Sequence, residues 1–181
     1  MIETLISSKT RIKLLMKFFI NSNTTSYLRG LQQEFGESSN AIRIELNRLE
    51  EAGMLRSETV GNKKMFRAND QHPLFSEIHN ILLKQIGIDR VVEQVIERLG
   101  NVERVYLIGD FSKGIDSTII DLLIIGSIDR SYMMSLVEKA EKVVNRKIRY
   151  LLYEAEEFSE SMLDRFTPAP LMLYFNKKET S

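Results

Sequence analysis

The chain has 181 residues with 25 basic side chains, 25 acidic side chains and no cysteine. A chain of this length can fold as one ordinary domain or as two small ones without disulfide bonds. The lack of cysteine excludes a disulfide framework, a thiolate zinc site, an iron–sulfur cluster and a cysteine nucleophile. Because His72 and His79 are the only histidines, a histidine-based metal centre is also disfavoured. We therefore expect no metal and no other cofactor.

Membrane and export signals are missing from the sequence pattern. No apolar run approaches the roughly 18 residues of a membrane span. The amino-terminal stretch MIETLISSKTRIKLL also lacks a basic start followed by a continuous apolar segment. We expect a cytoplasmic protein that is neither membrane-spanning nor exported.

The net charge of zero hides an asymmetry along the chain. Residues 1–69 carry 11 basic and 7 acidic side chains, whereas residues 70–181 carry 14 and 18. The first part therefore has a net charge of +4 and the second a net charge of −4. This change of sign predicts two domains, and a basic first domain suits a polyanionic partner.

Apolar residues at helical spacing predict three helices in the first part, followed by a hairpin. Capping and stop signals mark the ends of each helix. The first follows Ser7, Ser8 and Thr10 and stops at 21–23, and the second follows 24–26 and stops at Gly36. The third follows 37–39 and stops at Gly53. Extended segments at 56–60 and 63–68, joined by Gly61-Asn62, predict the hairpin.

The third helix has a polar face suited to reading DNA. When Ile42, Leu46 and Leu49 face the core, the helical period turns the opposite face outward. Arginine and asparagine are the residue types that read guanine and adenine edges, and hairpin cations can follow the phosphate backbone. The predicted DNA-binding residues are Ser38, Ser39, Asn40, Arg43, Asn47, Lys63, Lys64 and Arg67. The alternatives are a helical bundle with ordinary solvated charges, or a winged module used for protein contacts.

The blocks SSNAIRIELNRLEEAGML and GNKKMFRAN resemble the recognition helix and wing of winged-helix transcriptional regulators of the ArsR-like kind. The resemblance spans residues 1–69 and implies a winged helix-turn-helix domain that binds duplex DNA. Metal-sensing members of that group use cysteine or histidine clusters, which this part of the chain lacks. Metal responsiveness is therefore not implied.

The second part alternates helices and strands, which predicts an α/β unit. A connecting helix at 73–87 is apolar on both faces near its carboxyl end, so we expect it to pack on a neighbouring domain or a second subunit. The other expected elements are helices at 89–100 and 131–144, strands at 105–108 and 119–126, an extended run at 147–158, a helical turn at 161–165, and an edge strand or a packing segment at 171–175.

The stretch YLIGDFSKGIDSTIIDLLIIG resembles the minimal nucleotidyltransferase superfamily, in which a Gly-Ser turn precedes a strand bearing two aspartates. The resemblance covers roughly 88–153 and implies a cleft formed by Gly109, Asp110, Ser112, Lys113 and Asp121. The sequence departs from the family at the first aspartate, where Ile119 stands, and at the third acid, where Arg149 stands. Asp110 also replaces the turn serine.

These departures affect the chemistry directly. Nucleotidyl transfer needs two or three carboxylates on Mg²⁺, because the cation neutralises the attacking and leaving oxygens. Rescue by Asp110 or Asp116 would require the loop to fold inward, and Asp121 could instead be satisfied by backbone amides or by Arg149. We therefore expect a vestigial nucleotide cleft with no catalytic residues.

The sequence thus predicts an α/β (α+β) protein of two domains. These are a winged helix-turn-helix domain at 1–70, a linker helix at 71–87 and a nucleotidyltransferase-like domain at 88–181. The predicted function is a DNA-binding transcriptional regulator, a homodimer whose inactive second domain serves dimerisation, docking or sensing of a small-molecule or nucleotide effector. The alternatives are an active minimal nucleotidyltransferase that modifies a partner or small molecule, and an antitoxin-like interaction module.

Overall fold

A computed structural model describes residues 2–176 as two compact units that divide after Gln85. Together they contain helices and two β-sheets, one of three strands and one of four, which confirms the predicted mixed α and β class. No helix in the described range combines the length and apolar character needed to cross a membrane.

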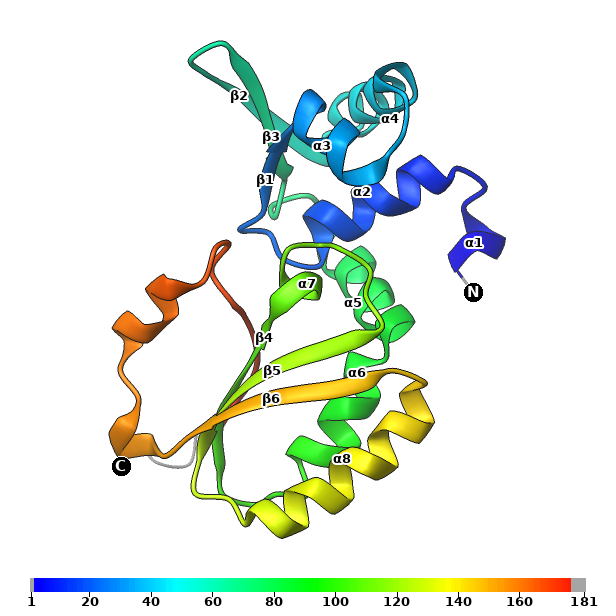
Figure 1. Cartoon of the computed structure of the whole chain (residues 1–181). Coiled ribbons are helices and arrows are strands. Elements are labelled where there is room, and N and C mark those ends of the chain that lie inside the picture. Colours follow the sequence, from blue (N-terminus) through cyan, green and yellow to red (C-terminus); the bar gives the residue numbers. More distant parts are fainter. Residues whose placement is uncertain (1, 177–181) are drawn as a thin grey trace. The chain divides into compact units, whose positions relative to one another are not determined.

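The first unit is mainly helical, with a small antiparallel sheet whose strand order is β1-β3-β2 (Figure 1). Its elements are α1 (Ile2–Leu5), α2 (Lys9–Phe19), β1 (Thr25–Tyr27), α3 (Leu28–Phe35), α4 (Ser39–Glu51), β2 (Leu55–Val60) and β3 (Lys63–Ala68). All of α5 (Phe75–Ile86) except its last residue also belongs to this unit.

The three predicted helices and the hairpin are present. Ser8 caps α2 and Ser38 caps α4, each by accepting a hydrogen bond from a backbone amide. The predicted inward row of α4 is buried, with Ile42, Leu46 and Leu49 each at most 4% exposed. Gly36 ends α3 in the left-handed conformation.

The start of the second helix was predicted wrongly. Residues 24–26 were expected to open that helix, but Thr25–Tyr27 form strand β1, and α3 begins at Leu28. Strand β1 pairs antiparallel with β3, with Ser26 opposite Phe66. This pairing forms backbone hydrogen bonds between residues that are far apart in the sequence, so no pattern of neighbouring residues predicts it.

The connecting helix α5 packs against α2 within the first unit. The ring of Phe75 stacks on that of Phe19 with centroids 5.5 Å apart. The Nδ1 atom of His79 lies 2.7 Å from the carbonyl oxygen of Phe19. This histidine is therefore engaged in helix packing. The predicted homodimer stays a prediction.

The second unit is a four-stranded sheet, order β6-β5-β4-β7, with flanking helices (Figure 1). Its elements are α6 (Ile88–Val91), the π-helical η1 (Val92–Ile96), β4 (Val102–Ile108), α7 (Gly109–Ser112), β5 (Ile119–Gly126), α8 (Arg130–Val144), β6 (Lys147–Tyr153), the 3-10 helices η2 (Ala155–Glu157) and η3 (Glu160–Arg165), and β7 (Leu171–Phe175). Strands β5 and β6 are parallel, and the other pairs are antiparallel.

Several predicted elements have different ends, and the strand expected at 105–108 already begins at Val102. The helix expected at 89–100 changes to π-helical geometry at Val92 and stops at Ile96. The extended run expected at 147–158 ends at Tyr153, because Glu154 and Glu157 form a reciprocal capping box that starts a 3-10 turn. The predicted edge strand at 171–175 is confirmed.

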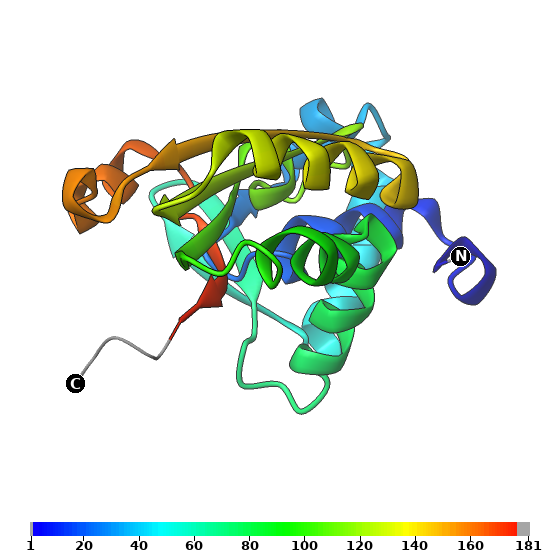
Figure 2. The same cartoon turned by 90° about the horizontal axis from the view of Figure 1, so that it is seen from below.

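The two faces of this sheet are covered differently. Figures 1 and 2 show α6 and α8 beside one another along the sheet, and Figure 1 shows the segment after β6 looping away on the opposite side. On that side Tyr106, Ile108, Leu123 and Ile125 form a buried cluster. Side chains of the looping segment pack on it: Phe158, Leu163 and Phe166, together with Tyr153 at the end of β6. The segment therefore acts as a cover for the second face.

Candidate functional site

The candidate site in the second unit begins at the tight turn after β4. Gly109 has a φ of +69°, a conformation that favours glycine. A Cβ atom at this position would lie 2.2 Å from Oδ2 of Asp121, far inside van der Waals contact. The turn therefore requires glycine, and this brings the turn backbone directly against the Asp121 carboxylate.

Asp121 is held by a cation on the neighbouring strand. Parallel pairing of β5 and β6 places Asp121 in register with Arg149, and Nε of Arg149 donates to Oδ1 of Asp121. The aspartate side chain is only 8% exposed, whereas the arginine side chain is 70% exposed. The hydrogen bond and charge of Asp121 raise the pKa of Arg149. Of the two partners left open for Asp121, the structure places Arg149 against it.

A cavity of about 470 Å³ opens beside this pair. Of the predicted cleft residues, Gly109, Ser112, Lys113 and Asp121 line it, but Asp110 does not. The hydroxyl of Ser112 donates to the Gly109 carbonyl oxygen at 2.9 Å, which braces the turn. Asp110 is exposed on α7.

Sequence reasoning missed part of the lining. Arg165, Phe166 and Pro168 border the cavity and come from the segment that covers the second face of the sheet. No motif marks them, because they reach the cavity only through the fold. The cavity thus combines the cations Lys113, Arg149 and Arg165 with a single lining carboxylate and an apolar wall. This arrangement suits an anionic group better than a cation.

The acids considered as substitutes do not join Asp121 in a metal site. Asp116 pairs with Nη2 of Arg146 at 3.2 Å. Within residues 2–176 no three histidine, aspartate or glutamate side chains gather in a way that could hold a metal ion. The partner of Asp121 is therefore the guanidinium of Arg149, and no set of carboxylates gathers around it in the described residues.

The Asp121–Arg149 pair predicts an unequal response to substitution. Arg149→Ala leaves a buried carboxylate without its cation, whereas Asp121→Asn leaves a guanidinium that water already solvates. We expect the urea midpoint of the second unit to fall clearly in Arg149→Ala and to change little in Asp121→Asn. Urea unfolding followed by circular dichroism measures both, and equal midpoints would contradict this assignment of the pair.

The predicted DNA-binding residues lie on α4, at its amino-terminal cap and on the hairpin, and only some of them line a common groove. Five of them line a groove in the first unit: Ser39, Arg43, Asn47, Lys63 and Lys64. The other three, Ser38, Asn40 and Arg67, lie outside its lining. The cap role of Ser38 and the ion pair of Lys64 with Glu50, 2.7 Å long, give two of these residues internal partners.

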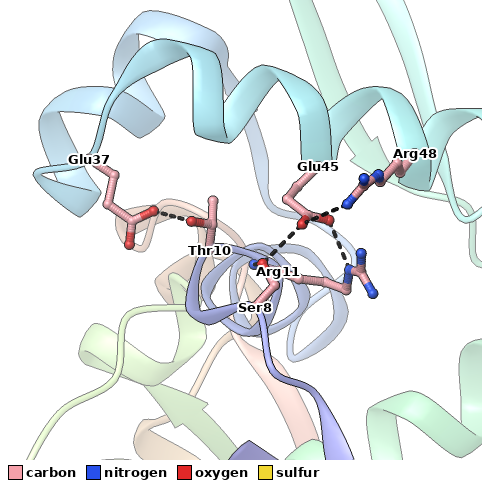
Figure 3. Close-up of polar contacts among 6 residues, drawn as sticks. All are labelled: Ser8, Thr10, Arg11, Glu37, Glu45 and Arg48. Atoms are coloured by element: carbon pink, nitrogen blue, oxygen red, sulfur yellow. Dashed lines mark hydrogen bonds and ion pairs between the residues drawn. The ribbon is translucent and has the colours of Figure 1, made fainter.

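Glu45 is the centre of a polar cluster that joins α4 to α2 (Figure 3). Its carboxylate accepts hydrogen bonds from Ser8 Oγ at 2.9 Å and Arg11 Nε at 2.8 Å, and Arg48 Nη1 lies 3.3 Å away. Burial alone would raise the pKa of Glu45. The hydrogen bonds from Arg11 and Ser8 and the charges of Arg11 and Arg48 outweigh burial and leave this pKa below its usual value of 4.5.

The lowered pKa fixes how the cluster depends on pH. A carboxyl group with a depressed folded-state pKa stabilises the fold above the unfolded-state value and loses that contribution as pH falls through the folded-state value. We expect Glu45→Gln to reduce the free energy of unfolding by about 1–2 kcal/mol at neutral pH, and the difference from wild type to vanish in acid. Urea unfolding across pH tests this, with exposed Glu51→Gln as a control that stays near wild type.

No protein-family model matches the chain, and no curated protein matches it. Solved structures resemble part of it. A mutant of the toxin–antitoxin pair MntA–HpeT has 14% identity and a TM-score of 0.39, and the match covers 50% of this chain and 74% of the other. A tri-AMPylated HEPN toxin of Shewanella oneidensis in complex with an MNT antitoxin has 12% identity and a TM-score of 0.36, with 52% and 72% covered.

These matches correct the predicted function. They are toxin–antitoxin complexes, so they contradict the prediction of a transcriptional regulator and agree better with the antitoxin-like alternative. They also give no support to duplex DNA as a partner. Identities of 12% and 14% with TM-scores below 0.5 assign neither an activity nor a partner to this chain.

Proposed function

We propose that the chain is an antitoxin-like interaction subunit, whose second unit has a nucleotidyltransferase-like fold, holds a partner protein and transfers no nucleotide. The observation that carries the proposal is the pairing of Asp121 with Arg149 on adjacent strands. The guanidinium occupies the position beside this carboxylate where a catalytic metal would be needed, and a transferase requires several free carboxylates there. The cleft is then a binding surface.

The topology supports the identity proposed for each unit. The first unit runs two helices, a strand, two helices and a hairpin, which favours a winged helix-turn-helix module at 1–70. The glycine turn at 109 between two antiparallel strands, followed by α8 and a parallel strand, favours a nucleotidyltransferase-like domain at 88–181. Residues 71–87, which contain α5 (Phe75–Ile86), are then the linker segment between these two domains in the sequence.

The sheet edge at β7 offers a docking surface for the partner. Met172 is 49% exposed and Phe175 is 44% exposed, and β7 is an outer strand of the sheet. The guanidinium of Arg104 lies over the Phe175 ring at 5.6 Å. An edge strand with exposed apolar side chains is prone to bind another chain. We assign the partner an apolar contact surface that covers these two residues.

Co-purification tests the docking surface. A tagged chain expressed in its organism of origin should bring down a stoichiometric partner, which Met172→Glu and Phe175→Glu should each release. Met134→Glu is the matched control, because Met134 is a methionine on α8 with a comparable exposure of 59%. An isolated chain without a partner, or a partner retained equally by all variants, would argue against the proposal.

The absence of transfer is tested on the purified complex. Incubation with labelled nucleoside triphosphates and Mg²⁺ should label neither polypeptide nor an added nucleic acid. Robust labelling that disappears in Asp121→Asn would instead establish the active transferase.

A further inference from the structure

A groove in the first unit lies between α3, α4 and the β2–β3 hairpin and has a volume of about 560 Å³. Its lining includes Leu46, which is 1% exposed, and Phe66, which is 4% exposed. These side chains are therefore seated in the core and reach the groove only as its floor. A hollow with an apolar floor fits a ligand that inserts an apolar group.

The rim of the groove is cationic. Arg29, Arg43, Lys63 and Lys64 line it, and no aspartate or glutamate does. The two lysines already have partners: Lys64 pairs with Glu50 at 2.7 Å, and Lys63 lies over the Tyr27 ring at 4.3 Å.

The two arginines are different. Both are exposed, and neither makes an ion pair within the described part of the chain. They come from different helices, Arg29 from α3 and Arg43 from α4, so they flank the groove. Guanidinium groups form paired hydrogen bonds with carboxylates, which makes arginine well suited to recognise acidic side chains.

We propose that this groove binds an acidic peptide segment of a partner protein, with an apolar side chain on the floor and flanking carboxylates on Arg29 and Arg43. A short peptide carries both features together. A DNA duplex presents a continuous phosphate backbone and base edges, and it has no apolar side chain that could fill the floor of the groove. The proposal goes beyond the docking of a partner on β7, because it concerns a separate site in the other unit.

Fluorescence anisotropy with the full-length chain tests this site. The probe is a fluorescein-labelled synthetic peptide, Asp-Glu-Glu-Leu-Phe-Glu-Glu-Asp. One control peptide replaces its acids by the corresponding amides, and a second replaces Leu-Phe by Gly-Ser. The acidic amphipathic peptide should bind, both controls should bind more weakly, and added salt should weaken the binding.

Substitutions locate the contact. The double variant Arg29→Gln, Arg43→Gln should weaken peptide binding by about five- to tenfold. Arg56→Gln is the matched control, since Arg56 is exposed on β2 outside the groove lining, and it should leave binding unchanged. Circular dichroism checks that each variant is folded.

Three results would overturn the proposal. The first is no peptide binding by the wild-type chain. The second is binding that is equal in the double variant and the control. The third is binding of a DNA duplex, lost in the double variant, together with no binding of the peptide.

Discussion

Gly126→Ala is expected to reduce the free energy of unfolding of the second unit by about 3–5 kcal/mol. Gly126 ends β5 with a φ of +148°, a backbone conformation that alanine avoids. An added Cβ would also lie 2.2 Å from the Asn101 carbonyl oxygen and 3.0 Å from the Val102 Cα. Both obstacles are backbone atoms, so relief requires β4 and β5 to separate at this end.

A second glycine separates these two causes. Gly100 also has a positive φ, +75°, but nothing lies within 4 Å of a Cβ placed there. Gly100→Ala should therefore cost only about 1–2 kcal/mol, from the backbone conformation alone. Urea unfolding gives both values, and amide hydrogen exchange of β4 and β5 reports the local effect. Equal losses in the two variants would show that the close approach at Gly126 is absent.

Phe111→Ala is expected to cost about 3–5 kcal/mol, because it removes a fully buried aromatic side chain and leaves a cavity. Phe111 is 0% exposed and lies on α7, between the glycine turn and Ser112. The guanidinium of Arg146 lies over its ring at 5.0 Å. Loss of the ring should therefore also loosen the turn that borders the cleft.

Tyr132→Ala is the matched control for this loss. Tyr132 is an aromatic residue on α8 with 47% exposure, so its removal should change stability by no more than about 0.5 kcal/mol. Thermal unfolding measures the stability, and hydrogen exchange at residues 109–115 measures the loosening. A stable Phe111→Ala variant with unchanged exchange would contradict the role of this side chain as the anchor of α7.

The sequence predicts the elements whose signals are local. The row Ile42, Leu46 and Leu49 repeats at helical spacing, and Gly61-Asn62 is a hairpin turn, so α4 and the β2–β3 pair follow from neighbouring residues. Strand β1 was missed because its partner β3 lies about forty residues further on and supplies the pairing. Residues 24–26 have a local preference to cap a helix, but the pairing with β3 decides their structure.

The candidate cleft is predictable only in part, for the same reason. Gly109 and Asp121 belong to a recognisable pattern, and the place of Arg149 follows from counting along the next strand. Arg165, Phe166 and Pro168 have no periodicity or motif, and the fold alone brings them to the cavity. The predicted function, a DNA-binding transcriptional regulator, was the largest error. An outward row of arginine and asparagine serves DNA recognition and protein contact equally well, so residue types alone could not decide between them.

Native mass spectrometry of the chain purified with its partner, before and after incubation with Mg²⁺ and nucleoside triphosphates, is the most direct test of the central claim. We expect a complex of two different polypeptides whose masses are unchanged by the incubation. A gain of one nucleoside monophosphate on either polypeptide, abolished by Asp121→Asn, would contradict it, as would a chain that is found only by itself.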